Sequence, residues 1–360
     1  MIIGIDLGTT NSLAAYFTED GPRIIPNRLG RHLTPSVVSV DENDQVFVGE
    51  TAKERGFLYP QMTASVFKRD MGSDRKYRLG ARDFTAQDLS SFVLRSLKED
   101  AEAFLQETVE EAVISVPAYF DDKRRKATKR AGELAGLKVE RSISEPTAAA
   151  IAYGLYEKQK NTKFLVFDLG GGTFDVSILE LFENILEVRA VAGDNYLGGE
   201  DFTELLVQHY MDKMGLKLTA LTQKTLGQIR KQAEACKLSY SRAASGTMNC
   251  RIDGEERPLA ITLKEYEKMC EPLLAKIRKP VQRSLSDAHV KLSDIDEIVL
   301  VGGATRLPVV RDFIIRMFKK FPDTAMNPDE AVALGAAIQG AMKERQEAVR
   351  EVILTDVCAF

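Results

Sequence analysis

Two stretches of the sequence share one pattern of apolar and polar positions. In residues 1–12 an apolar run ends at Asp6, a turn of glycine and threonine follows, and a second apolar stretch returns. Residues 164–177 repeat this order, with Asp168 at the end of the first run. Both segments therefore predict a buried β-hairpin with an aspartate at the end of its first strand.

The repeat extends beyond the two hairpins. Each hairpin is followed later by a second apolar strand pattern, at 112–118 and 297–303, and then by a helix pattern with proline near its start, at 145–154 and 327–335. Proline is tolerated there because the first helical N–H groups have no intrahelical partner. We therefore expect an α/β fold of two related lobes, a duplicated βββαβα unit, with a cleft between them.

The hairpins suggest phosphate chemistry. An aspartate ending a buried strand can hold a hydrated cation, and glycine in the turn lets backbone N–H groups approach phosphate oxygens closely. The chain contains neither the G-x-x-x-x-G-K-[ST] of a P-loop nor a strand-borne G-x-G-x-x-G. Carboxylates, hydroxyls, glycines and a single lysine instead suit phosphoryl transfer, which depends on positioning and charge neutralisation.

Composition narrows the class of protein. The 360 residues carry 49 Lys and Arg against 53 Asp and Glu, mixed along the chain, so no nucleic-acid-binding surface is indicated. The four cysteines have no C-x-x-C spacing, and neither a zinc site nor a disulfide framework is expected. No apolar run is long enough to span a bilayer, and Met1 leads directly into a strand pattern, so we expect a cytoplasmic protein without signal peptide or membrane contact.

Seven strings along the chain resemble the signatures of the ATPase domain of DnaK-type heat-shock chaperones, within the superfamily that includes actin and sugar kinases. In the family's order they are IGIDLGTTNS, VPAYF, EPTAAAIAYG, FDLGGGTFDVS, GDNYLGGEDF, VGGATRLP and NPDEAVA. Residues 89–102 and 352–358 are also similar to the HscC branch of that family. The resemblance implies an actin-like ATPase fold and the slow ATP-hydrolysing motor domain of a molecular chaperone, using ATP or ADP and Mg²⁺.

The resemblance also implies how the chain is divided. Lobe I would comprise residues 1–161, with an inserted subdomain at about 35–85. Lobe II would comprise residues 162–350, with its counterpart at about 198–271. Residues 351–360 would begin an interdomain linker to a peptide-binding domain that is absent from this chain, and an ordinary terminal strand is the alternative for them.

Matching motifs place the family's site residues on this sequence. The metal shell would consist of Asp6, Glu145, Asp168 and Asp175, with K⁺ also held by Asp6 and Asp175. The catalytic residues would be Lys68, which orients the attacking water, together with Asp6, Glu145, Asp168 and Thr173. The residues that bind the nucleotide would be Gly8, Thr9, Thr10, Asn11, Gly170, Gly171, Gly172, Gly198, Gly199, Glu234, Lys237, Ser241, Gly302, Gly303, Arg306 and Asp329.

The adenine side of this predicted site departs from the family pattern. Leu238 stands where many relatives have an arginine, and Ala304 stands where a hydroxyl residue is common. A cation over an aromatic face contributes roughly 0.5–2 kcal/mol. We therefore expect rapid nucleotide release and little need for an exchange factor.

Simpler interpretations stay open at several positions. Lys68 lies in a charged stretch, where lysines are normally solvated, and Glu145 before Pro146 could serve only to stabilise a helix N-terminus. The basic cluster at 123–130 is expected to be a solvated helix face. The alternative functions are a sugar or acetate kinase of the same fold, which would need its own acceptor pocket and general base, and an actin-like filament protein.

The resemblance further implies regulation by partners. Pro117 and Arg125 match relay positions of the family, and Arg141 and Asp356 match positions tied to J-domain co-chaperones and linker docking. The expected partners are a J-domain co-chaperone and, through the further domain, client peptides. The chain is expected to be a monomer that binds no nucleic acid.

Overall fold

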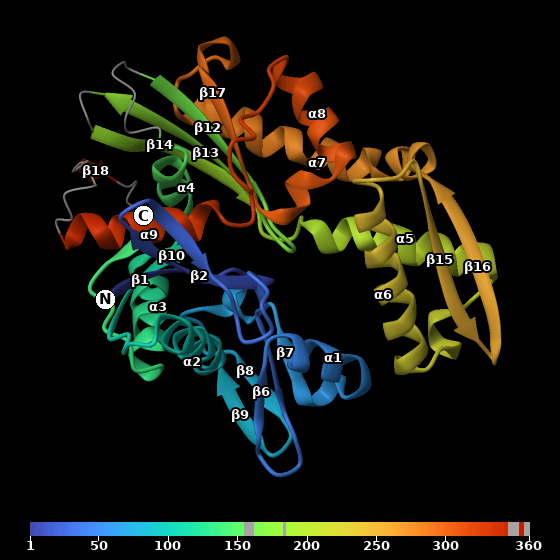
Figure 1. Cartoon of the computed structure of the whole chain (residues 1–360). Coiled ribbons are helices and arrows are strands. Elements are labelled where there is room, and N and C mark those ends of the chain that lie inside the picture. The colour runs from blue at the N-terminus through green and yellow to red at the C-terminus, as the bar shows by residue number, and fades with distance from the viewer. Residues whose placement is uncertain (155–161, 183–184, 345–352, 356–360) are drawn as a thin grey trace.

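The computed structural model contains two large mixed β-sheets with helices packed around and between them (Figure 1). It describes residues 1–154, 162–182, 185–344 and 353–355. The strands are β1 (Ile2–Asp6), β2 (Asn11–Thr18), β3 (Gly21–Ile25), β4 (Thr34–Pro35), β5 (Val37–Val40), β6 (Val46–Val48), β7 (Thr63–Ser65), β8 (Lys76–Leu79), β9 (Arg82–Thr85), β10 (Glu111–Val116), β11 (Ser142–Ser144), β12 (Thr162–Leu169), β13 (Phe174–Phe182), β14 (Ile185–Asp194), β15 (Ser245–Ile252), β16 (Glu255–Thr262), β17 (Glu297–Val301) and β18 (Ile353–Thr355).

The helices lie mostly on the faces of these sheets. The α-helices are α1 (Glu50–Leu58), α2 (Ala86–Leu105), α3 (Asp122–Leu134), α4 (Glu145–Ala152), α5 (Gly199–Met214), α6 (Gln223–Ser239), α7 (Leu263–Asp287), α8 (Pro308–Phe318) and α9 (Ala331–Lys343). The short 3-10 helices are η1 (Pro60–Met62), η2 (Phe67–Asp70), η4 (Leu218–Ala220), η5 (Leu292–Asp294) and η6 (Gly303–Arg306).

The two sheets repeat one topology, which confirms the duplication expected from the sequence. In the first, β1, β2 and β3 form an antiparallel meander and β10 lies parallel to β1. In the second, β12, β13 and β14 form the meander and β17 lies parallel to β12. Strand β11 extends the first sheet beside β10, and an isolated parallel bridge between Val299 and Asp323 occupies the matching place beside β17.

Helices α4 and α9 pack against each other between the sheets and join the two halves (Figure 1). Helix α9 comes from the second half of the sequence but lies on β1, β2 and β10 of the first sheet. A Cβ atom built on Gly335 would overlap the Ala148 carbonyl oxygen of α4, and one built on Gly4 would overlap the Ala337 amide nitrogen. Glycine at these two positions therefore lets backbone meet backbone where the halves join.

Two further groups of elements project from the sheets, and they fall within the ranges expected for the inserted subdomains (Figure 1). In the first half they are the sheet β6-β5-β7, the hairpin β8-β9 and helix α1. In the second half they are α5, α6 and the hairpin β15-β16. Helices α1 and α6 contact each other at the far side of the cleft. The subdomain boundaries themselves stay a prediction.

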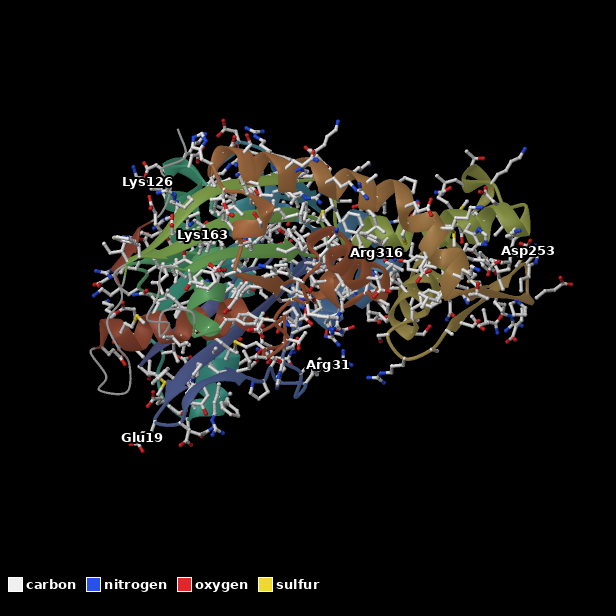
Figure 2. All side chains as sticks on the ribbon, turned by 90° about the horizontal axis from the view of Figure 1, so that it is seen from above. Glu19, Arg31, Lys126, Lys163, Asp253 and Arg316 are labelled. Atoms are coloured by element: carbon white, nitrogen blue, oxygen red, sulfur yellow. The ribbon has the colours of Figure 1, made fainter. Side chains whose placement is uncertain are left out.

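The outer helices cover the remaining sheet faces with apolar side chains. Helix α2 begins at a capping box in which the Thr85 hydroxyl accepts from the Asp88 N–H, and it buries Leu89, Val93 and Leu97 at helical spacing. Charged side chains point outward, as Figure 2 shows for Lys126. Lys123, Lys126 and Lys129 are exposed, as expected for a solvated face, but Arg124 and Arg125 of the same basic cluster are half-buried and contact Phe120.

Several predictions concern segments at the edge of the described structure. Strand β18 (353–355) pairs parallel with β14 at the edge of the second sheet, with Ile353 opposite Ile185. The rest of the expected linker, including Asp356, lies outside the described residues.

The cysteines of the described residues form no disulfide: Cys236, Cys250 and Cys270 are free and buried. Within the described residues no helix is both long and apolar enough to cross a bilayer.

The backbone contact at Gly335 predicts an unusual response to alanine. Alanine has a helix propensity about 1 kcal/mol better than glycine, yet Gly335→Ala should lower the free energy of unfolding by about 3 kcal/mol, because the new methyl overlaps the Ala148 carbonyl. Urea unfolding measures the change. Gly56→Ala in α1 is the control, since its new Cβ meets only the Thr63 side chain, at 3.2 Å. Equal stability of Gly335→Ala and the parent would contradict the close packing of α4 and α9.

Candidate functional site

The two glycine turns face each other across a cleft. The cleft has a volume of about 770 Å³, part of it open to solvent, and residues 8–11 of the first turn line it together with Gly170, Gly171 and Thr173 of the second. A Cβ atom built on Gly171 would overlap the Thr10 hydroxyl, so glycine allows the turns to meet this closely. A group bound here would contact backbone from both halves of the molecule.

Helix α5 supports the second turn from behind. The Gly199 N–H donates to the Gly170 carbonyl at 2.9 Å, and the Glu200 N–H donates to the Gly171 carbonyl at 2.7 Å. A Cβ atom built on Gly198 would overlap the Gly172 amide nitrogen. The structure therefore places Gly198 and Gly199 behind the turn, and neither they nor Gly172 are among the residues lining the cleft.

Four carboxylates come close together from four different elements, and three of them, Asp6, Glu145 and Asp168, line the cleft, whereas Asp175 does not. Asp6 ends β1, Asp168 is the second-to-last residue of β12, and Glu145 begins α4. Asp175 on β13 stands directly opposite Asp168 in the strand register. The sequence repeat and the antiparallel pairing of β12 with β13 thus place one acidic side chain on each of these four elements.

Crowding and burial disfavour the charged forms of these groups. Burial, followed by the charge of Glu145, raises the pKa of Asp6 to about 7, although Lys68 acts in the opposite direction. The same two causes raise the pKa of Asp175 to about 8 and hold the pKa of Asp168 well above its ordinary value. One nearby ammonium group is therefore too little to stabilise all of these carboxyl groups in their charged forms.

Lys68 is the cation of this cluster. It lies on η2, its side chain is only 5% exposed, and its Nζ donates to Glu145 Oε1 at 2.6 Å. The neighbouring Phe67 is 1% exposed and anchors the turn in the core of the first half. The simpler expectation of a solvated Lys68 is therefore wrong.

The donor set fits a hydrated divalent cation. Among the residues that the structure describes, no three His, Cys, Asp or Glu side chains lie close enough together to chelate a metal ion directly. Mg²⁺ keeps several of its waters, so carboxylates can hold it through water rather than by direct contact. Such an ion would supply the positive charge that balances the four carboxylates.

A second cavity adjoins the cleft at Pro328. It measures about 1010 Å³, again partly open to solvent, and Ser241, Thr305 and Arg306 are among its lining residues. Arg306 Nη1 donates to Asp329 Oδ2 at 2.7 Å, and Asp329 itself lines the first cleft with Gly302 and Gly303. The predicted nucleotide residues that line a cavity are thus divided between two neighbouring cavities, with Ser241 and Arg306 in the second.

Other residues predicted to contact the adenosine have protein partners in this structure. The Lys237 Nζ is buried and donates to the Gly199 carbonyl at 2.9 Å and to the Thr203 hydroxyl at 2.7 Å. Glu234 pairs with Lys53 of α1 at 3.5 Å, and Leu238 is 59% exposed. Glu234, Lys237 and Leu238 are not among the residues lining either cavity.

Ion pairs join α1 and α6 across the mouth of the cleft. Besides Lys53 and Glu234, Lys231 Nζ lies 3.1 Å from Glu54 Oε1. Both pairs are partly exposed to solvent, and such pairs contribute at most about 1 kcal/mol each. They nevertheless connect the two projecting groups of elements, a contact that no pattern in the sequence predicted.

Some residues at the cleft were missed by sequence reasoning. The Ser115 hydroxyl donates to Asp6 Oδ1 at 2.8 Å, and Arg69 and Tyr119 line the cleft. Ser115 interrupts an apolar strand pattern, and Arg69 is a second cation directly after Lys68. Both signals were visible in the sequence, but neither indicates a direction in space until the fold is known.

Comparison with known proteins identifies relatives of the whole chain. A family model described as Hsp70 protein matches residues 2–80 and 75–360. The chain is 44% identical over 370 residues to the chaperone protein DnaK of Thermotoga petrophila, covering 99% of this chain and 62% of that protein. It is 43% identical over 369 residues to the chaperone protein DnaK of Thermosipho africanus, with the same coverage. The chain thus spans 62% of the length of these curated relatives.

The crowded carboxylates predict that Asp168→Asn stabilises the chain without metal and reduces its stabilisation by Mg²⁺. Without divalent cations at pH 8, Asp168→Asn should raise Tm, by about 2–4 °C for each kcal/mol gained, because asparagine avoids the cost of burying a carboxyl group whose charged form is disfavoured there. Adding Mg²⁺ should raise the Tm of the parent more than that of the variant. Differential scanning fluorimetry gives both values.

The exposed Glu19→Gln provides the matched control for this substitution. It also removes one carboxylate, and it should change neither the metal-free Tm nor the response to Mg²⁺. A lower metal-free Tm for Asp168→Asn, or an undiminished response to Mg²⁺, would show that repulsion does not govern the cleft.

Proposed function

Because the chain belongs to the Hsp70 family, we propose that it is an ATP-binding chaperone motor domain that hydrolyses ATP slowly to ADP and phosphate. The observation that carries this proposal is the pair of facing glycine turns with carboxylates at their base. The turns offer backbone N–H groups to phosphate oxygens from two sides. The carboxylates offer a place for the cation that accompanies a nucleotide.

Water is the proposed acceptor of the phosphoryl group. Lys68 would leave Glu145 to orient this water and to offset the charge that develops on the transferred phosphate. Glu145 would then be free to accept a hydrogen bond from water, and the Thr173 hydroxyl would add one contact to the terminal phosphate. Catalysis would thus rest on positioning and charge, as phosphoryl transfer requires.

Mg²⁺ is the proposed cation of the cleft. Asp6, Glu145 and Asp168 would hold it through water, with Asp175 behind them. When bound, Mg²⁺ neutralises phosphate charge and aligns the phosphate chain. K⁺ at Asp6 and Asp175 is a further proposal that rests on the family resemblance.

The adenosine is proposed to occupy the second cavity. Arg306 would stack on one face of the base, with Ser241 nearby and the turn at 302–303 between base and phosphates. Glu234 and Lys237 would reach the ribose only after giving up their present partners. Leu238, exposed on α6, supplies no cation to the other face of the base, which supports the proposal of rapid release without an exchange factor.

The wider function is proposed from the relatives, which are chaperones longer than this chain. The nucleotide state would control a peptide-binding domain attached through the linker, and a J-domain co-chaperone would stimulate hydrolysis. The pairing of β18 with the edge strand β14 supports a linker that docks on the second sheet. Membership of the HscC branch, a cytoplasmic location and a monomeric state are proposed with it.

The alternative functions find no support. The family model and the cited relatives are Hsp70 and DnaK chaperones, and none is a sugar kinase, an acetate kinase or a filament protein. The experiments below nevertheless keep these alternatives as distinguishable outcomes.

Phosphate release from ATP without an added acceptor tests the proposed reaction directly. With Mg²⁺ and K⁺ the chain should release inorganic phosphate from ATP in single-turnover assays, without a sugar or acetate acceptor, and EDTA should abolish the release. Sedimentation with ATP should yield no polymer. Phosphate release no higher than background, or transfer of phosphate to an added sugar, would contradict the proposed function.

Removing the buried Lys68 tests its proposed catalytic role. Lys68→Ala should slow hydrolysis by about 100-fold or more, because the cation acts mainly on transition-state charge. The dissociation constant of ATP should change by no more than about threefold. Thr173→Ala should have a milder effect, since its hydroxyl is one contact among many. Quenched-flow single-turnover kinetics and equilibrium binding of a labelled nucleotide separate the two quantities.

Lys53→Ala is the matched control for this lysine. It removes a lysine from the same half of the molecule, but one whose ion pair lies at the exposed mouth of the cleft. Its hydrolysis rate should stay within about twofold of the parent, because exposed pairs contribute little. If Lys68→Ala hydrolyses normally, or loses ATP binding altogether, Lys68 does not have the proposed role.

A further inference from the structure

Helix η2 presents two cations to the cleft, and the function proposed above uses only the first. Arg69 follows Lys68 directly, and its Nη2 donates to the carbonyl oxygen of Gly172 in the second glycine turn. Its guanidinium carbon lies 5.5 Å from the centroid of the Tyr196 ring. Both partners belong to the second half of the chain. A single side chain therefore joins the group of elements at β5–β9 to the second turn.

The receiving side of this contact is built on fixed backbone. Tyr196 follows β14, and its N–H donates to Asp194 Oδ1 at 2.9 Å. The next residue, Leu197, is fully buried, and Gly198 packs against Gly172. The Tyr196 ring itself is 79% exposed, so its backbone is anchored on both sides while the ring is free to cover the guanidinium.

The turn at Gly172 leaves room for this guanidinium. A Cβ atom on Gly172 would lie 2.6 Å from the Nη2 atom of Arg69, closer than such atoms approach. Glycine at the third position of the turn thus leaves space for the guanidinium, which a Cβ atom would displace from its present place. This is a reason for Gly172 that does not involve a bound nucleotide.

The donating side is held in a strained conformation. Val66, which precedes η2, has φ 58° and ψ 12°, a left-handed conformation that β-branched residues rarely adopt. Phe67 and Met71 are buried at either side of the turn, and Asp70 accepts hydrogen bonds from Tyr77 and Arg75. The surrounding contacts therefore enforce the one conformation that directs Lys68 and Arg69 toward the cleft.

We propose that Arg69 is a positioning residue that acts through Lys68. Its contacts with Gly172 and Tyr196 hold η2 against the second glycine turn, so that Lys68 meets the phosphate bound between the two turns. Arginine suits this role because its planar guanidinium donates to a carbonyl and stacks on an aromatic ring at the same time, which a lysine ammonium does not do. The inference rests on the proposed hydrolysis of ATP.

The kinetic test uses paired substitutions in the full chain. Tyr196→Leu should slow single-turnover ATP hydrolysis about 2- to 5-fold, the effect of an exposed cation–π contact on a rate. Tyr196→Phe retains the ring and should hydrolyse at the parent rate. Arg69→Gln should slow hydrolysis about 10-fold, and Arg69→Lys should recover only part of the loss. The dissociation constant of ATP should stay within about threefold in each variant.

Coupling to the lysine distinguishes positioning from an independent role. If Arg69 acts through Lys68, Arg69→Gln should slow hydrolysis no further when Lys68 is already alanine. A full additional loss in that background would overturn the proposal, because Arg69 would then act on its own. A parent rate for Tyr196→Leu would overturn the role of the ring. If Arg69→Gln strongly lowers Tm but hydrolyses ATP at the parent rate, Arg69 has only a structural role and the proposal fails.

A second measurement reads the contact without hydrolysis. The chain contains no tryptophan, so Tyr196→Trp introduces a unique fluorophore at an exposed position. Acrylamide should quench this tryptophan less than it quenches the Tyr196→Trp, Arg69→Gln double variant. Equal quenching would overturn the contact. If the parent fails to hydrolyse ATP, the proposed function and the positioning role both fail, while the quenching difference still shows whether Arg69 covers residue 196.

Discussion

The repulsion among four carboxylates at the base of one cleft is the constraint on which this structure depends. Asp6, Glu145, Asp168 and Asp175 share the space with one ammonium group, and burial, followed by the nearby charge of Glu145, raises the pKa values of the three aspartates, so their charged forms are unfavourable there. A nucleotide would bring further negative charge to the same place. On the proposed function a cation would enter with the nucleotide and offset this charge.

The fold prevents the carboxylates from relieving this repulsion by moving apart. Each sits at the end of a strand or the start of a helix, and α4 and α9 lock the two sheets together by backbone contact at Gly335 and Gly4. The groups of elements that carry α1 and α6 project from this joined base, and two partly exposed ion pairs and the packing of Phe57 on Gly227 connect them. Rigidity at the base and weaker contact at the mouth suit a site that must hold charge and still admit a nucleotide.

The sequence predicted those features that depend on local pattern. The hairpins, the duplication and the aspartates at strand ends follow from apolar runs and turns, and the comparisons confirm the actin-like ATPase fold. Burial of Lys68 could not be predicted from its charged neighbours, because tertiary structure brings Glu145 to it and buries the adjacent Phe67 in the core. The hydrogen bonds of Lys237 to Gly199 and Thr203 likewise depend on how α5 and α6 pack. A motif gives a residue's position in the chain, but its present partners come from the fold.

The most direct test of the central claim is the dependence of ADP binding on divalent cations, measured by isothermal titration calorimetry. If carboxylate repulsion governs the cleft, chelating Mg²⁺ should weaken ADP binding by more than tenfold, which corresponds to about 1.4 kcal/mol, and Asp168→Asn should reduce that dependence. Equal affinity for ADP with Mg²⁺ and with EDTA would contradict the account, since phosphates would then bind beside the four carboxylates without a cation.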